Sequence, residues 1–211
     1  MRMTILGVTG STGAALLTQA LEHSHEVTAV ARTPARVTTS HPHLRVLPGD
    51  VLNAASLVAP FANSEVIISC VGVASPLQAR KGTTVYSAGT RNIIAAMQQS
   101  SVNRLIVVSS AGVAPRKGAP LIYKLLVKPF LLEPAYQDMR LMEAALTVTD
   151  LAWTIVRPPL LTGAALQTNY RLQADRNFDD DRPLGRASLA HFLLAEAENP
   201  RFVQRVVAIS G

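Results

Sequence analysis

The sequence predicts a single α/β domain over residues 1–211, built on a doubly wound parallel sheet, with a small C-terminal portion at 158–211. Three observations predict this fold. Short β-branched runs alternate with segments of helical periodicity along the chain. Several of these runs are apolar nearly throughout, as strands covered on both faces are. The longest irregular segments follow the runs, at the edge where parallel sheets bind ligands.

The expected strands and helices alternate in chain order, which implies right-handed crossovers between parallel strands. The expected strands are residues 3–8, 26–31, 44–48, 65–71, 104–110, 153–158 and 203–209. The expected helices are residues 12–23, 83–101, 135–147 and 188–198. The Pro- and Gly-rich connections expected to line a binding crevice are residues 32–43, 72–82, 112–120 and 158–163.

The composition excludes several classes of protein. Hydrophobic residues make up 48% of the 211 residues and charged residues 16%, which excludes global disorder. A single cysteine, Cys70, excludes an intrachain disulfide and fits a cytoplasmic location. We expect no secretory signal and no membrane span, because no apolar run approaches ~18–20 residues. The scattered net charge of +6 favours a small anionic ligand over nucleic acid, and we expect a monomer or homodimer.

The stretch GVTGSTG places three glycines between the first strand and the first helix. In this context Gly7 permits a tight turn, Gly10 lets a diphosphate approach the backbone, and Gly13 lets the helix pack closely. The helix N-terminus offers free N–H groups and a partial positive charge to phosphate. We expect Thr12 to cap this helix and, with Ser11, to add hydroxyl donors. The alternative is a glycine-rich turn that binds nothing.

The end of the second strand distinguishes NAD from NADP. NAD-binding proteins usually place Asp or Glu there to accept from the ribose 2′-hydroxyl, but no carboxylate lies between Val27 and Val46. The run VTAVAR ends instead in Arg32, which suits a 2′-phosphate, and Arg36 could reinforce it. We therefore expect NADP(H) to be preferred and NAD(H) to be second. In the alternative reading Arg32 is a solvated loop residue.

Other segments at the same sheet edge are candidates for cofactor contacts. Asp50 is placed to accept from the adenine amino group, while Val51 packs on the ring. Gly72 lets the chain pass close to the ribose and the diphosphate. The candidate cofactor-binding residues that these motifs supply are Gly7, Thr9, Gly10, Ser11, Thr12, Gly13, Arg32, Asp50, Val51, Cys70, Val71, Gly72 and Ser109.

With these motifs the chain resembles the atypical and extended short-chain dehydrogenase/reductase superfamily of Rossmann-like proteins. It is most similar to the small NAD(P)-binding members of the NmrA-like and biliverdin reductase B (flavin reductase) type. The resemblance spans nearly the whole length. It rests on GVTGSTG at 7–13, AVAR at 29–32, GDV at 49–51, the stretch at 88–110, TIVRPPLLT at 154–162 and GRASLAHFLL at 185–194.

The resemblance also implies roles for two C-terminal segments. In the family the segment after IVRP covers the nicotinamide and begins the substrate side, so Pro158, Pro159 and Leu160 are implied cofactor contacts. A second family element corresponds to Arg186–Ala190, where Ser188 replaces an acidic residue and is expected to cap the helix.

Classical members of this superfamily use Ser, Tyr and Lys, with Tyr and Lys four residues apart on one helix. The cation is needed because a tyrosine of pKa ~10 is a poor acid–base group at neutral pH. Ser110 ends the fifth strand, where that serine belongs, and Tyr136 and Arg140 have the required spacing. The family's Tyr and Lys positions, however, correspond to Ala135 and Met139. Ser110, Tyr136 and Arg140 are the catalytic candidates.

A second reading gives these residues structural roles. Tyr136 then packs in the core, and Arg140 pairs with Asp138, Glu143 or solvent. A mechanism like that of flavin reductases does not need the Tyr/Lys pair. The site holds cofactor and acceptor close together so that hydride passes directly, and Ser110 assists by hydrogen bonding.

The remaining features are less specific. The apolar segment 120–134, with Tyr123 as a lid residue, reads as an interfacial helix, a cover for the substrate crevice or a subunit contact. We expect no metal site, because the five histidines lack the spacing and the carboxylate partners of a ligand set. A serine hydrolase is disfavoured by the absence of a GxSxG turn.

The favoured function is reduction of a small apolar or aromatic acceptor, such as a flavin, quinone or carbonyl, by hydride transfer from NADPH. The alternative is a non-catalytic, NADP(H)-sensing regulatory protein, because the Tyr/Lys pair is displaced. A relative of the nucleotide-sugar epimerases comes third, since residues 158–211 leave little room for a substrate subdomain.

Overall fold

The computed structural model describes residues 1–73, 79–80, 82–114 and 132–211. The strands of its main sheet are β1 (Arg2–Leu6), β2 (Glu26–Ala31), β3 (Leu44–Pro48), β4 (Val66–Ser69), β5 (Arg104–Val108), β6 (Ala152–Arg157), β8 (Arg171–Ala174) and β10 (Arg205–Ser210). The eight strands lie in the order β3-β2-β1-β4-β5-β6-β10-β8. All neighbours are parallel except β8, which runs antiparallel to β10. The predicted doubly wound parallel sheet is confirmed.

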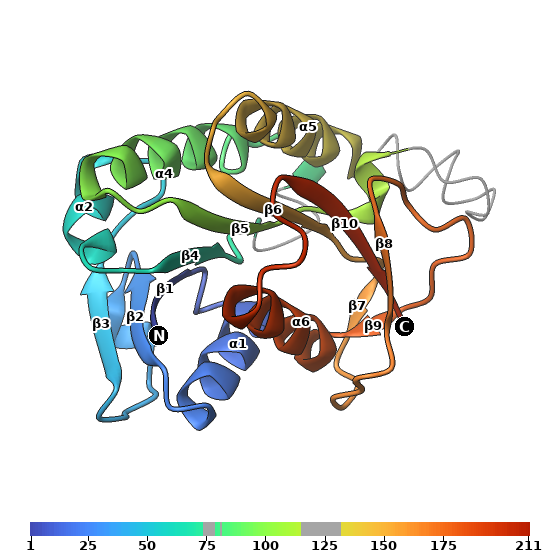
Figure 1. The fold of residues 1–211 in the computed structure, drawn as a ribbon. Coiled ribbons are helices and arrows are strands. Elements are labelled where there is room, and N and C mark those ends of the chain that lie inside the picture. Colours follow the sequence, from blue (N-terminus) through green and yellow to red (C-terminus); the bar gives the residue numbers. More distant parts are fainter. Residues whose placement is uncertain (74–78, 81, 115–131) are drawn as a thin grey trace.

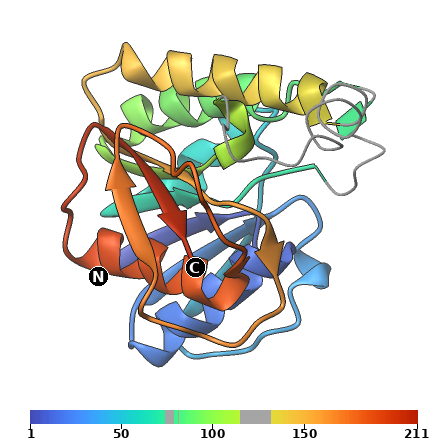
Figure 2. The same cartoon turned by 90° about the vertical axis from the view of Figure 1, so that its right-hand side faces the viewer.

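Helices cover both faces of this sheet (Figure 1). One face carries α1 (Ser11–Glu22) and α6 (Arg186–Glu198), which pack against each other. The other carries α2 (Ala55–Phe61), α4 (Ser87–Ser100) and α5 (Glu133–Thr147). Figure 2, turned by 90°, shows the same three layers. Short 3₁₀ turns, η1 (Pro34–Arg36) and η2 (Ala111–Val113), follow β2 and β5.

The apolar core is divided by the sheet into two clusters. Successive residues of β4 illustrate the division: Ile67 belongs to the cluster under α4 and α5, and Ile68 to the cluster under α1 and α6. Both side chains are fully buried. Neighbouring side chains of a strand point to opposite faces, so a strand covered on both sides must be apolar throughout.

The crevice of such a sheet lies where the strand order reverses. Here the reversal falls between β1 and β4, because β2 and β3 extend the sheet on one side of β1 and β5 and β6 extend it on the other. The loops that leave the carboxyl ends of β1 and β4 therefore flank the site, as the sequence predicts.

The start of α4 shows how a distant residue sets an element boundary. The pattern predicts a helix from residue 83, but α4 begins at Ser87. A buried carboxylate from α5, Asp138, accepts from the backbone N–H of Tyr86 at 2.9 Å and from that of Ser87 at 3.3 Å. Asp138 thus satisfies N–H groups that a local cap would otherwise satisfy.

Short elements in the C-terminal portion were not predicted. Between β6 and α6, β7 (Leu161–Thr162) and β9 (Leu184–Gly185) form a separate two-stranded parallel sheet. The rest of 158–211 belongs to the main layers, because β8 and β10 extend the large sheet and α6 packs on α1. In the described part of the chain, no helix has the length and apolar character needed to cross a membrane. Most of the segment 120–134, including Tyr123, lies outside the described residues.

Candidate dinucleotide site

Gly7 and Gly13 are required by the packing of the chain itself. Gly7 has φ +82°, and a Cβ there would lie 2.6 Å from the carbonyl carbon and oxygen of Cys70. A Cβ on Gly13 would lie 2.3 Å from the Gly7 carbonyl oxygen. Both distances are far below van der Waals contact, so the turn and the close approach of α1 to it require glycine at each position.

Gly10 differs from these two glycines. Its φ is −89°, which other residues adopt. Among the described residues, the single atom within 4 Å of an added Cβ is the Gly7 carbonyl oxygen at 3.3 Å. Gly10 and the neighbouring Thr9 and Ser11 are exposed. The bare backbone of Gly10 therefore faces outward, where an added side chain would occupy the space of a ligand.

The start of α1 is suited to an anion. Gly10 is the N-cap residue, no side chain caps the helix, and no acidic residue lies in its first turn. The prediction that Thr12 caps the helix is wrong, because α1 begins one residue earlier, at Ser11, and places Thr12 inside the first turn. The first N–H groups of a helix have no intrahelical acceptor, so they remain available to a diphosphate. These residues fit the phosphates of a dinucleotide.

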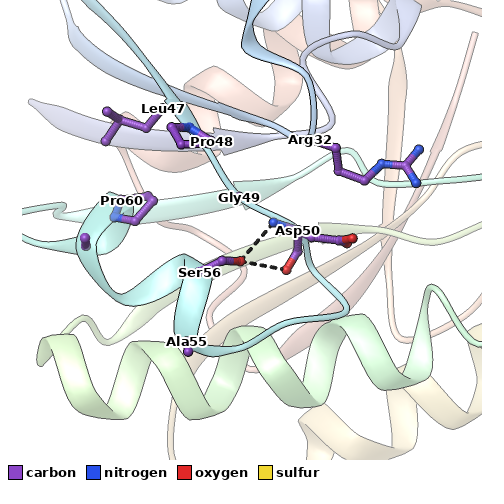
Figure 3. A pocket seen from close by; sticks show the side chains of 9 residues that line it. Arg32, Leu47, Pro48, Gly49, Asp50, Ala55, Ser56 and Pro60 are labelled. Atoms are coloured by element: carbon purple, nitrogen blue, oxygen red, sulfur yellow. Dashed lines mark hydrogen bonds between the residues drawn. The ribbon is translucent and has the colours of Figure 1, made fainter.

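A cavity of 610 Å³ adjoins the carboxyl ends of β2 and β3. Its lining residues are Arg32, Leu47, Pro48, Gly49, Asp50, Ala55, Ser56, Ala59 and Pro60. Figure 3 shows that the side chains of Arg32 and Asp50 extend from neighbouring strand ends in the same direction. Arg32 is exposed and forms no ion pair with any described residue. Its guanidinium therefore has donors available for a phosphate.

The loop after β3 is held by side chains that the sequence reasoning missed. Ser56 accepts from the Asp50 N–H at 2.9 Å and donates to the Asp50 carbonyl oxygen at 3.1 Å. Asn92 of α4 donates to the Val51 carbonyl oxygen at 2.9 Å. Asp50 itself accepts from the Leu52 N–H at 3.0 Å through Oδ1. Each contact joins residues that belong to different elements or to an irregular loop, so no periodic pattern in the sequence predicts it.

The segment after β4 is positioned by Tyr86. The Tyr86 phenol oxygen accepts from the Val73 N–H at 3.2 Å, and a Cβ on Gly72 would lie 3.4 Å from that oxygen. Burial raises the pKa of Tyr86, so the phenol stays protonated at neutral pH. Burial likewise raises the pKa of the Cys70 thiol to about 12, which makes Cys70 an unreactive packing residue at this edge.

The three catalytic candidates surround η2. Ser110 accepts from the Gly112 N–H at 3.2 Å. The Tyr136 ring lies against Gly112, where an added Cβ would come within 2.2 Å of the ring carbon Cζ. Arg140 donates to the Val113 carbonyl oxygen at 3.0 Å and pairs with Glu133. Tyr136 and Arg140 thus reach the same turn from one face of α5, as their spacing predicts.

Neither carboxylate expected to pair with Arg140 does so, although its side chain is 39% exposed to solvent. Asp138 and Glu143, the two carboxylates predicted for it, are both buried and bind other groups. Arg140 instead pairs with Glu133, which lies seven residues earlier, about two turns nearer the start of α5. Ala135 and Met139 are buried in the apolar cluster under α5, so the family's Tyr and Lys positions are occupied by core residues.

A buried polar network lies behind the end of β5. Glu143 of α5 accepts from the Ser109 hydroxyl at 2.6 Å and from Arg157 Nε at 2.9 Å. Asn177 accepts from Arg157 at 3.5 Å and donates to the Ala111 carbonyl oxygen at 2.8 Å. The Ser109 hydroxyl hydrogen is therefore committed to Glu143, and the Ser109 N–H donates to the Val156 carbonyl oxygen at 2.7 Å. The network ties β5, α5, β6 and the loop after β8 together.

The implied nicotinamide segment follows β6 directly. The Pro158 carbonyl oxygen accepts from the Ala111 N–H at 2.9 Å, which holds the segment beside η2. Leu160 is 70% exposed. Ser188 is not a cap, because α6 begins at Arg186 with Gly185 as its N-cap residue. The buried Ser188 hydroxyl instead accepts from the Gln167 N–H at 2.9 Å and fixes the loop after β7.

The fold and the site define an NAD(P)-binding protein of Rossmann-like architecture. The chain belongs to the family described as NAD(P)H-binding, whose model matches residues 7–200. This confirms NAD(P)H as the cofactor. The fold is shared with a short-chain dehydrogenase/reductase of known structure, as the resemblance implies. The finer resemblance to NmrA-like and flavin reductase-like proteins stays a prediction.

Curated relatives match only part of the chain. A 3-beta-hydroxysteroid dehydrogenase from Mycolicibacterium neoaurum is 30% identical over 120 residues, which are 53% of this chain and 32% of that protein. A 3 beta-hydroxysteroid dehydrogenase/Delta 5-->4-isomerase from Mycobacterium tuberculosis is 31% identical over 120 residues, with the same coverage. The match thus spans about a third of the length of these relatives.

Solved structures match the whole chain at lower identity. A short-chain dehydrogenase/reductase from Veillonella parvula, in complex with NADP, has a TM-score of 0.80 and 20% identity, covering 100% of this chain and 94% of that one. An NAD-dependent epimerase/dehydratase from Bacillus halodurans has a TM-score of 0.82 and 18% identity, covering 100% and 94%. At these identities the likeness shows the shared fold.

Proposed function

We propose that the chain is an NADPH-dependent oxidoreductase that reduces a small apolar or aromatic acceptor, such as a flavin, quinone or carbonyl. The observation that carries this proposal is the placement of Arg32 at the end of β2, exposed and without an ion pair among the described residues. A carboxylate at this position would select NAD, whereas an arginine suits the 2′-phosphate of NADP.

Different residues bind different parts of NADPH. The first N–H groups of α1 hold the diphosphate, and the guanidinium of Arg32 holds the 2′-phosphate. Val51 and Asp50 form the adenine side, fixed by Asn92 and Ser56. When bound, NADPH supplies a hydride to the acceptor.

The other side of the site positions the acceptor. Pro158 is buried, so the half-buried Pro159 and the exposed Leu160 offer apolar contacts to it. Ser110 has its oxygen engaged by the Gly112 N–H, and the described residues offer its O–H no acceptor, so that O–H is available to donate to an acceptor oxygen. Proximity then accounts for much of the rate, and Tyr136 and Arg140 support the catalytic turn η2.

A second candidate function is an NADP(H)-sensing regulator without turnover. It is supported by the burial of Ala135 and Met139 at the family's Tyr and Lys positions and by the engagement of Arg140 with Glu133. Steady-state oxidation of NADPH with a flavin, a quinone and a steroid ketone separates the two functions. Turnover with at least one acceptor supports the reductase, and tight NADPH binding without turnover favours the sensor.

The cofactor preference is tested by Arg32→Ala. We expect the Kd for NADPH to rise by about 10–100-fold, because a charge-assisted contact to phosphate is lost, while the Kd for NADH stays the same. Isothermal titration calorimetry with both nucleotides measures this. Arg45→Ala is the matched control, since Arg45 is an exposed arginine at the amino end of the neighbouring strand β3. Equal losses for NADPH and NADH in Arg32→Ala would contradict the assignment.

A further inference from the structure

The C-terminal end of α1 brings two histidines and a glutamate together. His23 Nδ1 lies 3.1 Å and His25 Nε2 lies 2.8 Å from the same oxygen, Oε1 of Glu198 at the end of α6. The three donor atoms all lie within 4.8 Å of one another. The prediction that the histidines lack a carboxylate partner is therefore wrong for this pair. Glu198 is 175 residues from His23 in the sequence, so spacing alone could not reveal it.

We propose that His23, His25 and Glu198 form a binding site for a divalent transition-metal ion of the zinc class. Two imidazoles and one carboxylate are a donor set that Zn²⁺ uses in proteins, with a further position for water, whereas Mg²⁺ and Ca²⁺ prefer oxygen ligands. Tetrahedral coordination with bonds of about 2.0–2.1 Å separates neighbouring donor atoms by about 3.3 Å. Two of the three separations are thus already close to this value.

The backbone holds the two histidines in this arrangement. His23 is the C-cap residue of α1, and Ser24 adopts the left-handed conformation with φ +60°. The N–H of Ser24 donates to the Leu21 carbonyl oxygen and that of His25 to the Ala20 carbonyl oxygen, both at 3.0 Å. These two bonds define a Schellman motif, which reverses the chain so that residues 23 and 25 present their side chains to one point.

The environment favours metal ligation by both rings. The side chain of His25 is 12% exposed, that of Glu198 28% and that of His23 52%, so an ion can reach the site from solvent.

A metal ion at this site would stabilise the fold and would not take part in the reaction. The site joins the last residues of α1 to those of α6, and α1 has 12 residues, which places it about 18 Å from the glycine-rich turn. A bound ion would clamp the two helices that cover one face of the sheet (Figure 1). Binding to the folded state alone would then raise the melting temperature, by about 5–10 °C at 100 times the Kd.

The test is calorimetric titration of the tag-free chain with ZnCl₂ after dialysis against a chelator. We expect one ion per chain and a loss of affinity of about 100-fold in His23→Gln/His25→Gln. The chain supplies a matched control, because His41 and His43 have the same spacing with ring centroids 5.5 Å apart. His41→Gln/His43→Gln should bind Zn²⁺ as the parent does.

Glu198→Gln provides a second, isosteric variant in case the double variant does not fold, which far-UV circular dichroism would show. We expect its affinity for Zn²⁺ to fall about tenfold, while the Kd for NADPH stays that of the parent. Absence of stoichiometric Zn²⁺ binding to the parent, or equal affinities in the two double-histidine variants, would overturn the proposal. Such a result would leave a hydrogen-bonded helix contact and would not affect the proposed reductase function.

Discussion

The two ends of α1 bind by different means. At its N-terminal end the chain presents bare backbone: Gly7 and Gly13 let the turn and the helix approach each other, and Gly10 leaves the first N–H groups exposed. At its C-terminal end the chain presents side chains, because a Schellman motif aims His23 and His25 at Glu198. One end suits an anion and the other a cation, as the direction of the helix dipole favours.

This difference teaches where local sequence is informative. Backbone sites need glycine at fixed spacing, so the site at the N-terminal end can be predicted from the seven residues 7–13. Side-chain sites need residues that the fold brings together. The site at the C-terminal end can therefore be recognised only once the structure places α6 beside α1. The variants below separate the two ends by their effects on stability and on cofactor binding.

Gly13→Ala should have the largest effect. Its Cβ would lie 2.3 Å from the Gly7 carbonyl oxygen, so the backbone must move. We expect the free energy of unfolding to fall by about 3 kcal/mol and NADPH binding to be lost. Urea unfolding and calorimetry measure the two effects. Gly163→Ala is the control, because no atom of the described residues lies within 4 Å of its added Cβ. Equal stabilities of the two variants would contradict the packing argument.

Gly10→Ala should separate binding from folding. Its φ of −89° suits alanine, and its Cβ would lie 3.3 Å from the Gly7 carbonyl oxygen. We expect the free energy of unfolding to change by less than about 1 kcal/mol, but the Kd for NADPH to rise about tenfold, because the methyl group occupies the space of the diphosphate. Unchanged NADPH affinity would show that the diphosphate does not approach Gly10.

Glu198→Gln should have the smallest effect, and it should change stability without changing cofactor binding. In the presence of a chelator, we expect the free energy of unfolding to fall by about 0.5–1 kcal/mol, because Glu198 and both histidines are partly exposed. The Kd for NADPH should equal that of the parent. A change in NADPH affinity would mean that the C-terminal end of α1 affects cofactor binding, which would contradict the independence of the two ends.

Much of the fold was predictable from the sequence. The runs expected as strands all form strands of the main sheet, because strands such as β4 are buried on both faces and must be apolar. The short strands β7 and β9, of two residues each, carry too few residues for a periodic signal. The helix α2 was missed because it has seven residues and contains Pro60, which normally argues against a helix.

The site was predictable only where the backbone defines it. The turn at 7–13 and the place of Arg32 follow from residue types at fixed positions along one strand–helix–strand unit. The caps assigned to Thr12 and Ser188 were wrong, because the N-cap residues of α1 and α6 are Gly10 and Gly185, two and three residues earlier. The role of Glu143, which joins Ser109 to Arg157, needs three elements in place and has no local signature.

The central claim is that the N-terminal end of α1 holds the diphosphate of NADPH and that its C-terminal end does not contact the cofactor. A titration of the ¹⁵N-labelled chain with NADPH, followed through the backbone amide resonances, tests both halves of this claim. The account predicts that the largest shifts occur at Gly10, Ser11, Thr12 and Gly13, while the amides of His23 and His25 stay in place. Shifts absent from residues 10–13 at saturating NADPH would contradict it.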